Sequence, residues 1–81
     1  MLDQLADPVK RCVGTKQVIR AIESGQAVCV FIAGDADSHI RQRVRNACAD
    51  ADLEPVEVDS MQELGQACHI QVGAATACVL R

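Results

Sequence analysis

The sequence predicts an α/β fold, an α/β sandwich in which a β-sheet carries helices on both faces. Two segments, residues 27–33 (Ala-Val-Cys-Val-Phe-Ile-Ala) and 74–80 (Ala-Ala-Thr-Ala-Cys-Val-Leu), are continuously apolar and rich in strand-forming residues. Such runs are typical of central strands that are covered on both faces. Segments with the apolar spacing of helices separate the strand candidates along the chain. Strands that alternate with helices indicate this layered architecture.

The N-terminal part of the chain predicts a helical turn followed by a short strand. Residues 2–7 can form a helical turn, and Pro8 ends it. Residues 9–13 are short and partly alternate between apolar and polar side chains, as in a strand at the edge of a sheet. A similar short strand is expected at residues 55–58, where Val56 and Val58 alternate with a glutamate, also at the periphery.

A helix is predicted between the first strand and the central strand at residues 27–33. Val18, Ala21 and Ile22 follow the i, i+3, i+4 spacing of one helix face. Thr15 is suited to the N-cap, because its hydroxyl can accept a hydrogen bond from the first turn. Gly25 stands where a helix ends in a left-handed residue. The helix is therefore expected over about residues 15–24.

Two further helices are predicted after the central strand, each with its own cap. Asp37 can cap a helix whose apolar residues continue to about residue 52. Ser60 and Glu63 match the S-x-x-E capping box at the start of a third main helix.

Length and hydropathy predict one domain, covering residues 1–81, in the cytoplasm. A chain of 81 residues holds a single modest core. No apolar run approaches the ~18 residues of a membrane helix. The N-terminal residues contain neither a basic region nor an apolar region of the kind found in signal peptides.

Composition excludes some kinds of nucleic-acid recognition. Phe31 is the only aromatic residue, and the formal net charge is −3. RRM and OB domains stack bases on aromatic side chains, so both are excluded as models for this chain. An acidic protein does not attract RNA or DNA through its overall field. Any RNA binding must therefore rest on a local basic patch, and no binding to DNA is expected.

The sequence also contains no motif typical of a cofactor site, a metal site or a catalytic centre. The number of cysteines is odd and no pair has C-x-x-C spacing, which predicts reduced, buried thiols. Cys68 and His69 are adjacent, but no second ligand pair follows at a zinc-like spacing. None of the common nucleotide-binding or hydrolase motifs occurs. We therefore expect a protein that is not an enzyme and has neither metal nor cofactor.

A basic cluster near the first helix is the strongest candidate for a binding site. Lys10, Arg11, Lys16 and Arg20 fall within eleven residues, and the last two share a helix face. Lys16 and Gln17 lie in the first turn, where free backbone N–H groups favour an anion such as a phosphate. A solvated helix face is the alternative interpretation of the same residues.

Four pieces of the chain match one family pattern in order and spacing. They are Gly14-Thr15-Lys16-Gln17, Ser24-Gly25, Ala33-Gly34-Asp35-Ala36-Asp37, and Leu64-Gly65-Gln66-Ala67-Cys68 followed by Ile70-Gln71-Val72-Gly73-Ala74-Ala75. The chain resembles the ribosomal L7Ae/L30e family over about residues 9–80, and in particular its short bacterial kink-turn-binding members. The resemblance implies a three-layer α-β-α sandwich around a mixed four-stranded sheet.

The same resemblance implies binding to kink-turn RNA, a bent duplex with tandem sheared G·A pairs. In the family, the N-terminus of the helix after the first strand enters the major groove at those pairs, and a loop after the third main helix packs against extruded nucleotides. The helix positions here are Gly14, Thr15, Lys16, Gln17 and Arg20. The loop positions are Gln66, Ala67, Cys68, His69, Ile70, Gln71 and Val72. Lys16 and Gln17 would meet the G·A edges, and Arg20 would reach a phosphate.

Two positions depart from the family pattern, and they bear on function. At the positions of Lys16 and Gln17 many members have Asn and Glu, whereas the short bacterial forms commonly have Lys and Gln. The bacterial pattern usually has glycine at His69, so this histidine either tolerates a left-handed backbone or stacks on a base.

The expected partner is a ribosomal or regulatory kink-turn RNA, with the ribosome as a candidate assembly and no membrane. The alternative is a protein-interaction module of the same fold with weakened or lost RNA binding.

Overall fold

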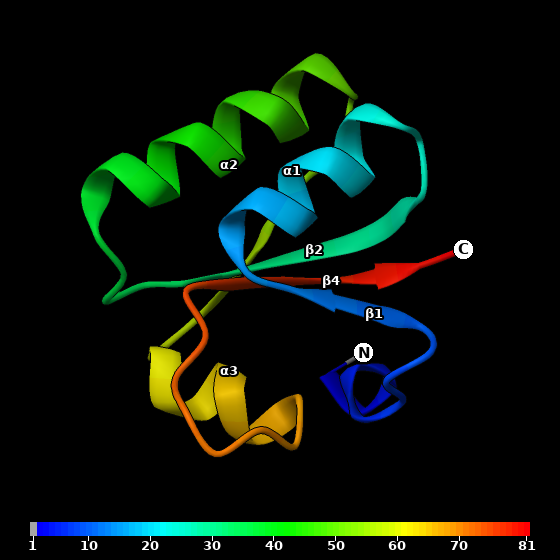
Figure 1. Cartoon of the computed structure of the whole chain (residues 1–81). Coiled ribbons are helices and arrows are strands. Elements are labelled where there is room, and N and C mark those ends of the chain that lie inside the picture. Colours follow the sequence, from blue (N-terminus) through cyan, green and yellow to red (C-terminus); the bar gives the residue numbers. More distant parts are fainter. Residues whose placement is uncertain (1) are drawn as a thin grey trace.

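The computed structural model describes residues 2–81 (Figure 1). One short 3₁₀ helix, three α-helices and four strands follow one another along these residues. They are η1 (Leu2–Ala6), β1 (Arg11–Val13), α1 (Thr15–Glu23), β2 (Ala27–Ala33), α2 (Ser38–Asp50), β3 (Val56–Val58), α3 (Met61–Ala67) and β4 (Thr76–Leu80).

The four strands form one mixed sheet in the order β1-β4-β2-β3. β4 pairs antiparallel with both β1 and β2, whereas β3 pairs parallel with β2. The two continuously apolar strands are thus the central ones and the two short strands lie at the edges, as predicted. The mixed four-stranded sheet implied by the family resemblance is confirmed.

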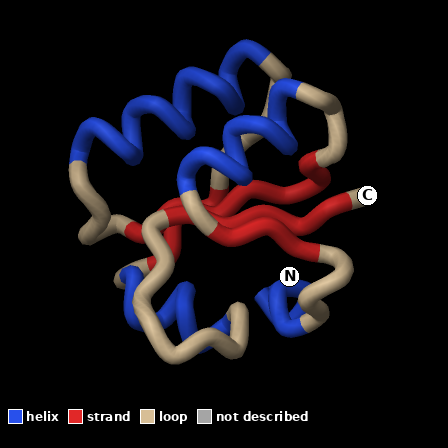
Figure 2. The backbone as a smooth tube through the Cα atoms, viewed as in Figure 1, coloured by secondary structure: helices blue, strands red, loops and turns tan. Residues whose placement is uncertain are grey.

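Helices cover both faces of the sheet, which gives three layers (Figure 2). α1 and α2 lie over one face, and α3 and η1 lie over the other (Figure 1). Alternation along the strands sends side chains to both layers: Val30 and Ile32 of β2 point to α1 and α2, whereas Phe31 and Ala33 point to α3. The sheet therefore has an apolar core on each side.

Some boundaries of the predicted elements differ from the structure. β1 begins at Arg11 rather than residue 9, because Lys10 donates its backbone N–H to Asp7 in a turn (3.1 Å) and Val9 is exposed. β4 begins at residue 76 rather than 74. The prediction that residues 27–33 are fully covered is wrong at Val28, which is 52% exposed next to an irregularity in the β2–β4 pairing.

The predicted caps of α2 and α3 are confirmed. The Asp37 carboxylate accepts a hydrogen bond from the backbone N–H of His39 (2.8 Å). The Ser60 hydroxyl oxygen accepts one from the N–H of Glu63 (3.1 Å). Each cap satisfies an N–H group that the first turn of a helix leaves without a partner.

The cap of α1 is glycine rather than the predicted threonine. Gly14 is the N-cap residue, with φ 101° and ψ 148°, and no side chain caps this helix. Thr15 is the first helical residue. At the other end Gly25 has φ 76°, and its N–H donates to the carbonyl of Ile22 (3.1 Å), so the predicted left-handed glycine is confirmed.

Within residues 2–81, no helix combines the length and the apolar composition needed to cross a bilayer. The five cysteines are free thiols: Cys48, Cys68 and Cys78 are buried, and Cys12 and Cys29 are half-buried.

Candidate nucleic-acid interface

The N-terminus of α1 is exposed and positively charged. Val18 donates the first helical hydrogen bond, to the carbonyl of Gly14 (2.9 Å), so the amides of the preceding first-turn residues point out of the helix end without an intrahelical acceptor. Lys16 and Gln17 are exposed in this turn, and Arg20 is exposed one turn later. The helix dipole and these free amides favour a negatively charged ligand at this place.

Gly14 has a backbone conformation at the start of α1 that residues with a side chain rarely adopt. Its φ of 101° and ψ of 148° lie in a region that essentially only glycine adopts. A Cβ atom at this position would also lie 3.1 Å from the Oε1 atom of Gln17. The flexible end of the Gln17 side chain therefore packs close to the N-cap, and a Cβ atom there would displace it slightly.

Arg11 does not belong to the basic cluster in which the sequence placed it. Its Nε donates to the backbone carbonyl of Leu5 in η1 (2.8 Å), on the face of the sheet opposite α1. Neighbouring residues of a strand point to opposite faces, so Cys12 lies on the α1 side, and Lys10 lines a groove there together with Gln17 and Arg20. The cluster near α1 accordingly consists of Lys10, Lys16 and Arg20, while Arg11 attaches η1 to the sheet.

The loop between α3 and β4 is held against α3 by backbone contacts. Ile70 donates its N–H to the carbonyl of Gly65 (3.1 Å), and Ala74 donates its N–H to the carbonyl of Met61 (3.0 Å). Gly65 has no room for a side chain, because a Cβ atom there would overlap the carbonyl oxygen of Val72. The loop therefore lies directly on the backbone of α3, and its shape is fixed from both ends.

The predicted loop residues differ in how accessible they are. His69 is exposed and has φ 58°, so the position does adopt a left-handed backbone. Gln71 is exposed, Val72 is 70% exposed and Ile70 is half-buried. Cys68 was predicted as an RNA contact, but its side chain is 0% exposed and packs in the core beneath α3. Its role in the loop is therefore to anchor the chain.

The structure brings the loop and the N-terminus of α1 together. The loop leads directly into β4, and Thr76 at the start of that strand accepts a hydrogen bond from the N–H of Gly14 (3.1 Å). Figure 2 shows the loop rising from α3 to the point where α1 begins. Two segments that are more than fifty residues apart in the sequence are thus joined where β4 begins.

A hollow of about 400 Å³ lies beside the loop and includes residues that the sequence interpretation did not assign to the site. Asp35 is one of them: its carboxylate accepts a hydrogen bond from the N–H of Met61 at the start of α3 (2.7 Å). Asp35 belongs to the Ala33–Asp37 piece of the family pattern, which is the signal that could have included it. The hollow is lined by Asp35, Met61, Gln62, Gln66, Ile70, Gln71, Val72 and Gly73.

The family model described as "Ribosomal protein L7Ae/L30e/S12e/Gadd45 family" matches residues 1–81. The chain belongs to this family. RNA-binding protein YbxF of Geobacillus stearothermophilus is 49% identical to it over 72 residues, which are 89% of this chain and 88% of that protein. Large ribosomal subunit protein eL8 of Halobacterium salinarum is 37% identical over 68 residues, which are 83% of this chain and 57% of that protein.

A solved structure has the same fold as this L7Ae-family chain. The Giardia lamblia 15.5kD RNA binding protein superposes with a TM-score of 0.89 at 27% sequence identity, covering 99% of this chain and 68% of that one. The three-layer architecture around a mixed sheet is therefore shared with that protein.

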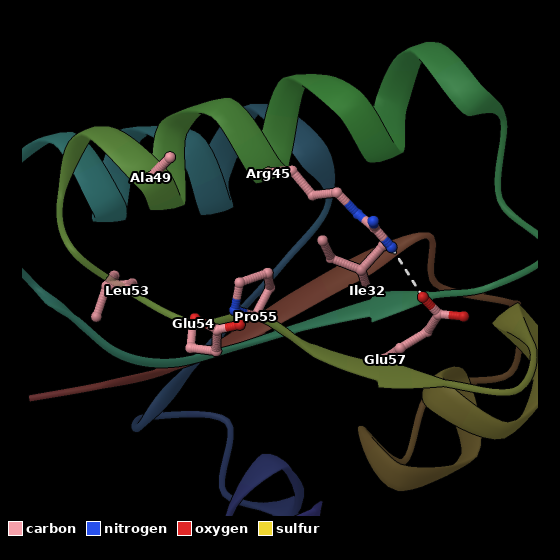
Figure 3. A pocket seen from close by; sticks show the side chains of 7 residues that line it. All are labelled: Ile32, Arg45, Ala49, Leu53, Glu54, Pro55 and Glu57. Atoms are coloured by element: carbon pink, nitrogen blue, oxygen red, sulfur yellow. Dashed lines mark hydrogen bonds and ion pairs between the residues drawn. The ribbon is translucent and has the colours of Figure 1, made fainter.

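Positive charge on the L7Ae-family surface is distributed unevenly. Arg45 of α2 forms an ion pair with Glu57 of β3 (2.8 Å), above the apolar side chain of Ile32 (Figure 3). Among residues 2–81, by contrast, Lys16 and Arg20 have no acidic partner. The uncompensated cations of α1 therefore lie beside the exposed N-terminus of that helix.

Within residues 2–81, no group of three His, Cys, Asp or Glu side chains is arranged to hold a metal ion.

Proposed function

We propose that this protein binds kink-turn RNA and stabilises its bent form, without enzymatic activity. The observation that supports this most directly is the junction of two exposed segments: the α1 N-terminus and the α3–β4 loop meet where Gly14 donates to Thr76. Relatives that match almost the full chain bear the name RNA-binding protein. A ribosomal or regulatory RNA is the proposed partner, with the ribosome as a candidate assembly in the cytoplasm.

The α1 N-terminus has the groups needed to recognise sheared G·A pairs. An ordinary A-form duplex hides its major groove, but a kink opens it locally and admits a helix end. The amide of Gln17 offers both donors and an acceptor to base edges, and Lys16 offers donors only. Arg20 stands one turn further along α1 and reaches the phosphate backbone, which positions the RNA without reading its sequence.

The α3–β4 loop provides the second half of the proposed contact. Val72 and Gln71 are exposed on a loop whose backbone is fixed on α3, so they present a rigid surface to a nucleotide outside the stack. A rigid loop loses little conformational entropy on binding. Because both elements fit only the bent RNA, binding shifts the population of the RNA toward that form.

A gel-shift titration tests the proposal. The protein is titrated against a kink-turn duplex and against a matched duplex in which the tandem G·A pairs are Watson–Crick pairs. We expect complex formation with the kink-turn and a roughly 5- to 150-fold weaker complex with the control, since loss of good base-edge contacts costs ~1–3 kcal/mol. Equal affinity for the two duplexes would contradict kink-turn recognition.

A protein-interaction module of the same fold is the second candidate. The formal net charge of −3 favours it, because RNA-binding surfaces usually carry an excess of positive charge. This candidate predicts that neither duplex shifts at low salt. It is distinguished from non-specific RNA binding, in which both duplexes shift equally.

A further inference from the structure

A groove runs along the outer side of α1, from its first turn to the end of the chain. Its volume is about 430 Å³, and it lies between α1, the residues before β1 and the last residue of the chain. Lys10, Arg20 and Arg81 line it, together with Gln17. In Figure 1 the start of β1, the end of α1 and the C-terminus lie on one side of the molecule.

The groove is basic in a protein that is acidic as a whole. Three of its lining residues are cations and none is Asp or Glu. Each of four other hollows on the surface includes at least one carboxylate, such as Glu57 beside Arg45, Asp35 beside the α3–β4 loop, or Glu23 on the other side of α1. Of these five hollows, this groove is therefore the one whose cations have no carboxylate beside them in its lining, although the net charge of the chain is −3 and Lys10 also borders the hollow that includes Asp7.

The fold places Lys10 and Arg81 together at one end of the groove, where β4 ends. Arg81 donates its backbone N–H to Gln26 (2.9 Å) and its Nε to the carbonyl of Gly25 (2.7 Å), at the C-terminus of α1. The other guanidinium N–H groups remain for a ligand, because arginine carries five N–H donors. The backbone of Lys10 is held by the hydrogen bond from Leu80 to its carbonyl (2.8 Å), and the residue lines the groove together with Gln17 and Arg20.

We propose that this groove binds the phosphate backbone of a duplex arm that continues from the kink, with Lys10 and Arg81 as phosphate contacts. The inference rests on the proposed function, because the groove is continuous with the α1 N-terminus through Gln17 and Arg20. The nine residues of α1 span about 14 Å at ~1.5 Å per residue. An RNA arm must therefore extend past the G·A pairs before it reaches Arg81.

Kink-turn RNAs whose duplex arms differ in length test the inference. The double variant Lys10→Gln/Arg81→Gln is compared with wild type on two kink-turn RNAs, one with a long arm and one trimmed next to the G·A pairs. We expect roughly tenfold weaker binding of the long-arm RNA at low salt, and a salt slope reduced by about two units, since each lost phosphate contact lowers it by ~0.9. Affinity for the trimmed RNA should change less than about twofold.

The matched control is the double variant Arg43→Gln/Arg45→Gln, which removes the same charge from α2. It should leave both affinities within about twofold of wild type, because neither arginine lines the groove. The fold should be retained, because exposed ion pairs such as Arg45–Glu57 contribute little to stability. Equal losses on both RNAs, or equal losses in the control, would overturn the groove proposal while leaving kink-turn binding intact. If wild type does not distinguish the kink-turn from the Watson–Crick duplex, the proposed function fails and the groove proposal fails with it.

Discussion

Gly65 of α3 lies so close to Val72 that its Cα has no room for a methyl group. A Cβ atom at position 65 would overlap the carbonyl oxygen of Val72, and the carbonyl of Gly65 itself accepts the N–H of Ile70 (3.1 Å). The loop proposed to contact RNA is thus shaped by a glycine in the helix before it.

Replacement of Gly65 by alanine should therefore destabilise the protein. The clash is with backbone, which cannot rotate away as a flexible side chain can, so we expect a loss of ~1–3 kcal/mol in the free energy of unfolding. Urea denaturation measures it. Gln66→Ala is the control, because that side chain is exposed and its loss should change stability by less than about 0.5 kcal/mol. A variant at position 65 as stable as the control would show that the loop can move away without cost.

The first turn of α1 should separate base recognition from phosphate binding. Arg20→Ala is expected to weaken binding similarly for all kink-turn sequences and to lower the salt slope by about one unit. Gln17→Ala should instead reduce discrimination against the RNA that lacks G·A pairs, by ~1–3 kcal/mol. Both side chains are exposed, so thermal unfolding should be unchanged. Identical binding phenotypes in the two variants would contradict these roles.

His69 has a left-handed backbone, which glycine adopts without strain, so replacement of His69 by glycine should not destabilise the protein. Its φ is 58° and its N–H donates to Gln66 (3.0 Å) in the turn that ends α3. Glycine at this position should relieve ~1 kcal/mol of backbone strain, offset in part by greater freedom of the unfolded chain. We expect unchanged or higher thermal stability for His69→Gly and unchanged RNA affinity.

The competing account of His69 predicts a different result in the same experiment. The imidazole is exposed, and a base stacked on it would contribute ~1–3 kcal/mol of binding. A His69→Gly variant that unfolds like wild type but binds the kink-turn at least about tenfold more weakly would make His69 a recognition residue. Thermal unfolding and gel-shift titration of the same preparation distinguish the two.

Buried thiols should make the protein less stable at alkaline pH. Burial, together with the smaller effect of the neighbouring Cys12 thiol, raises the pKa of Cys78 from the ordinary 9.0 to about 12. The folded state therefore keeps a proton that the unfolded state releases. The stabilisation is complete below about pH 9 and is lost as the pH rises toward 12, at up to ~1.4 kcal/mol per pH unit for one such group.

Urea denaturation between pH 8 and about 11, under reducing conditions, measures this loss. Cys78→Ala should be less stable than wild type at pH 8 because it leaves a cavity, yet its stability should fall less steeply with pH. A smaller decline should remain, because burial also raises the pKa values of Cys29, Cys48 and Cys68. Parallel declines in wild type and variant would refute the assignment to Cys78.

The sequence by itself determined the two central strands, the order of the elements and several helix ends. The apolar runs at residues 27–33 and 74–80 can only be covered on both faces in a layered fold, so their central place followed from hydropathy alone. Asp37, Ser60 and Gly25 are local signals, because a cap or a left-handed residue acts within a few positions of itself. The motifs that match the family likewise indicated which helix and which loop to propose as the RNA-binding site.

Tertiary structure alone decided which of the candidate residues share a surface. Gly14 caps α1 in place of Thr15, and its amide pairs with Thr76, a partner more than sixty residues away. The bond of Arg11 to Leu5 takes its side chain away from α1, and the core takes up Cys68 although the next residue, His69, is exposed. Arg81 joins the groove along α1 only because β4 ends beside Gly25. Contacts between distant segments leave no periodic signal in the sequence, so they appear only once the chain is folded.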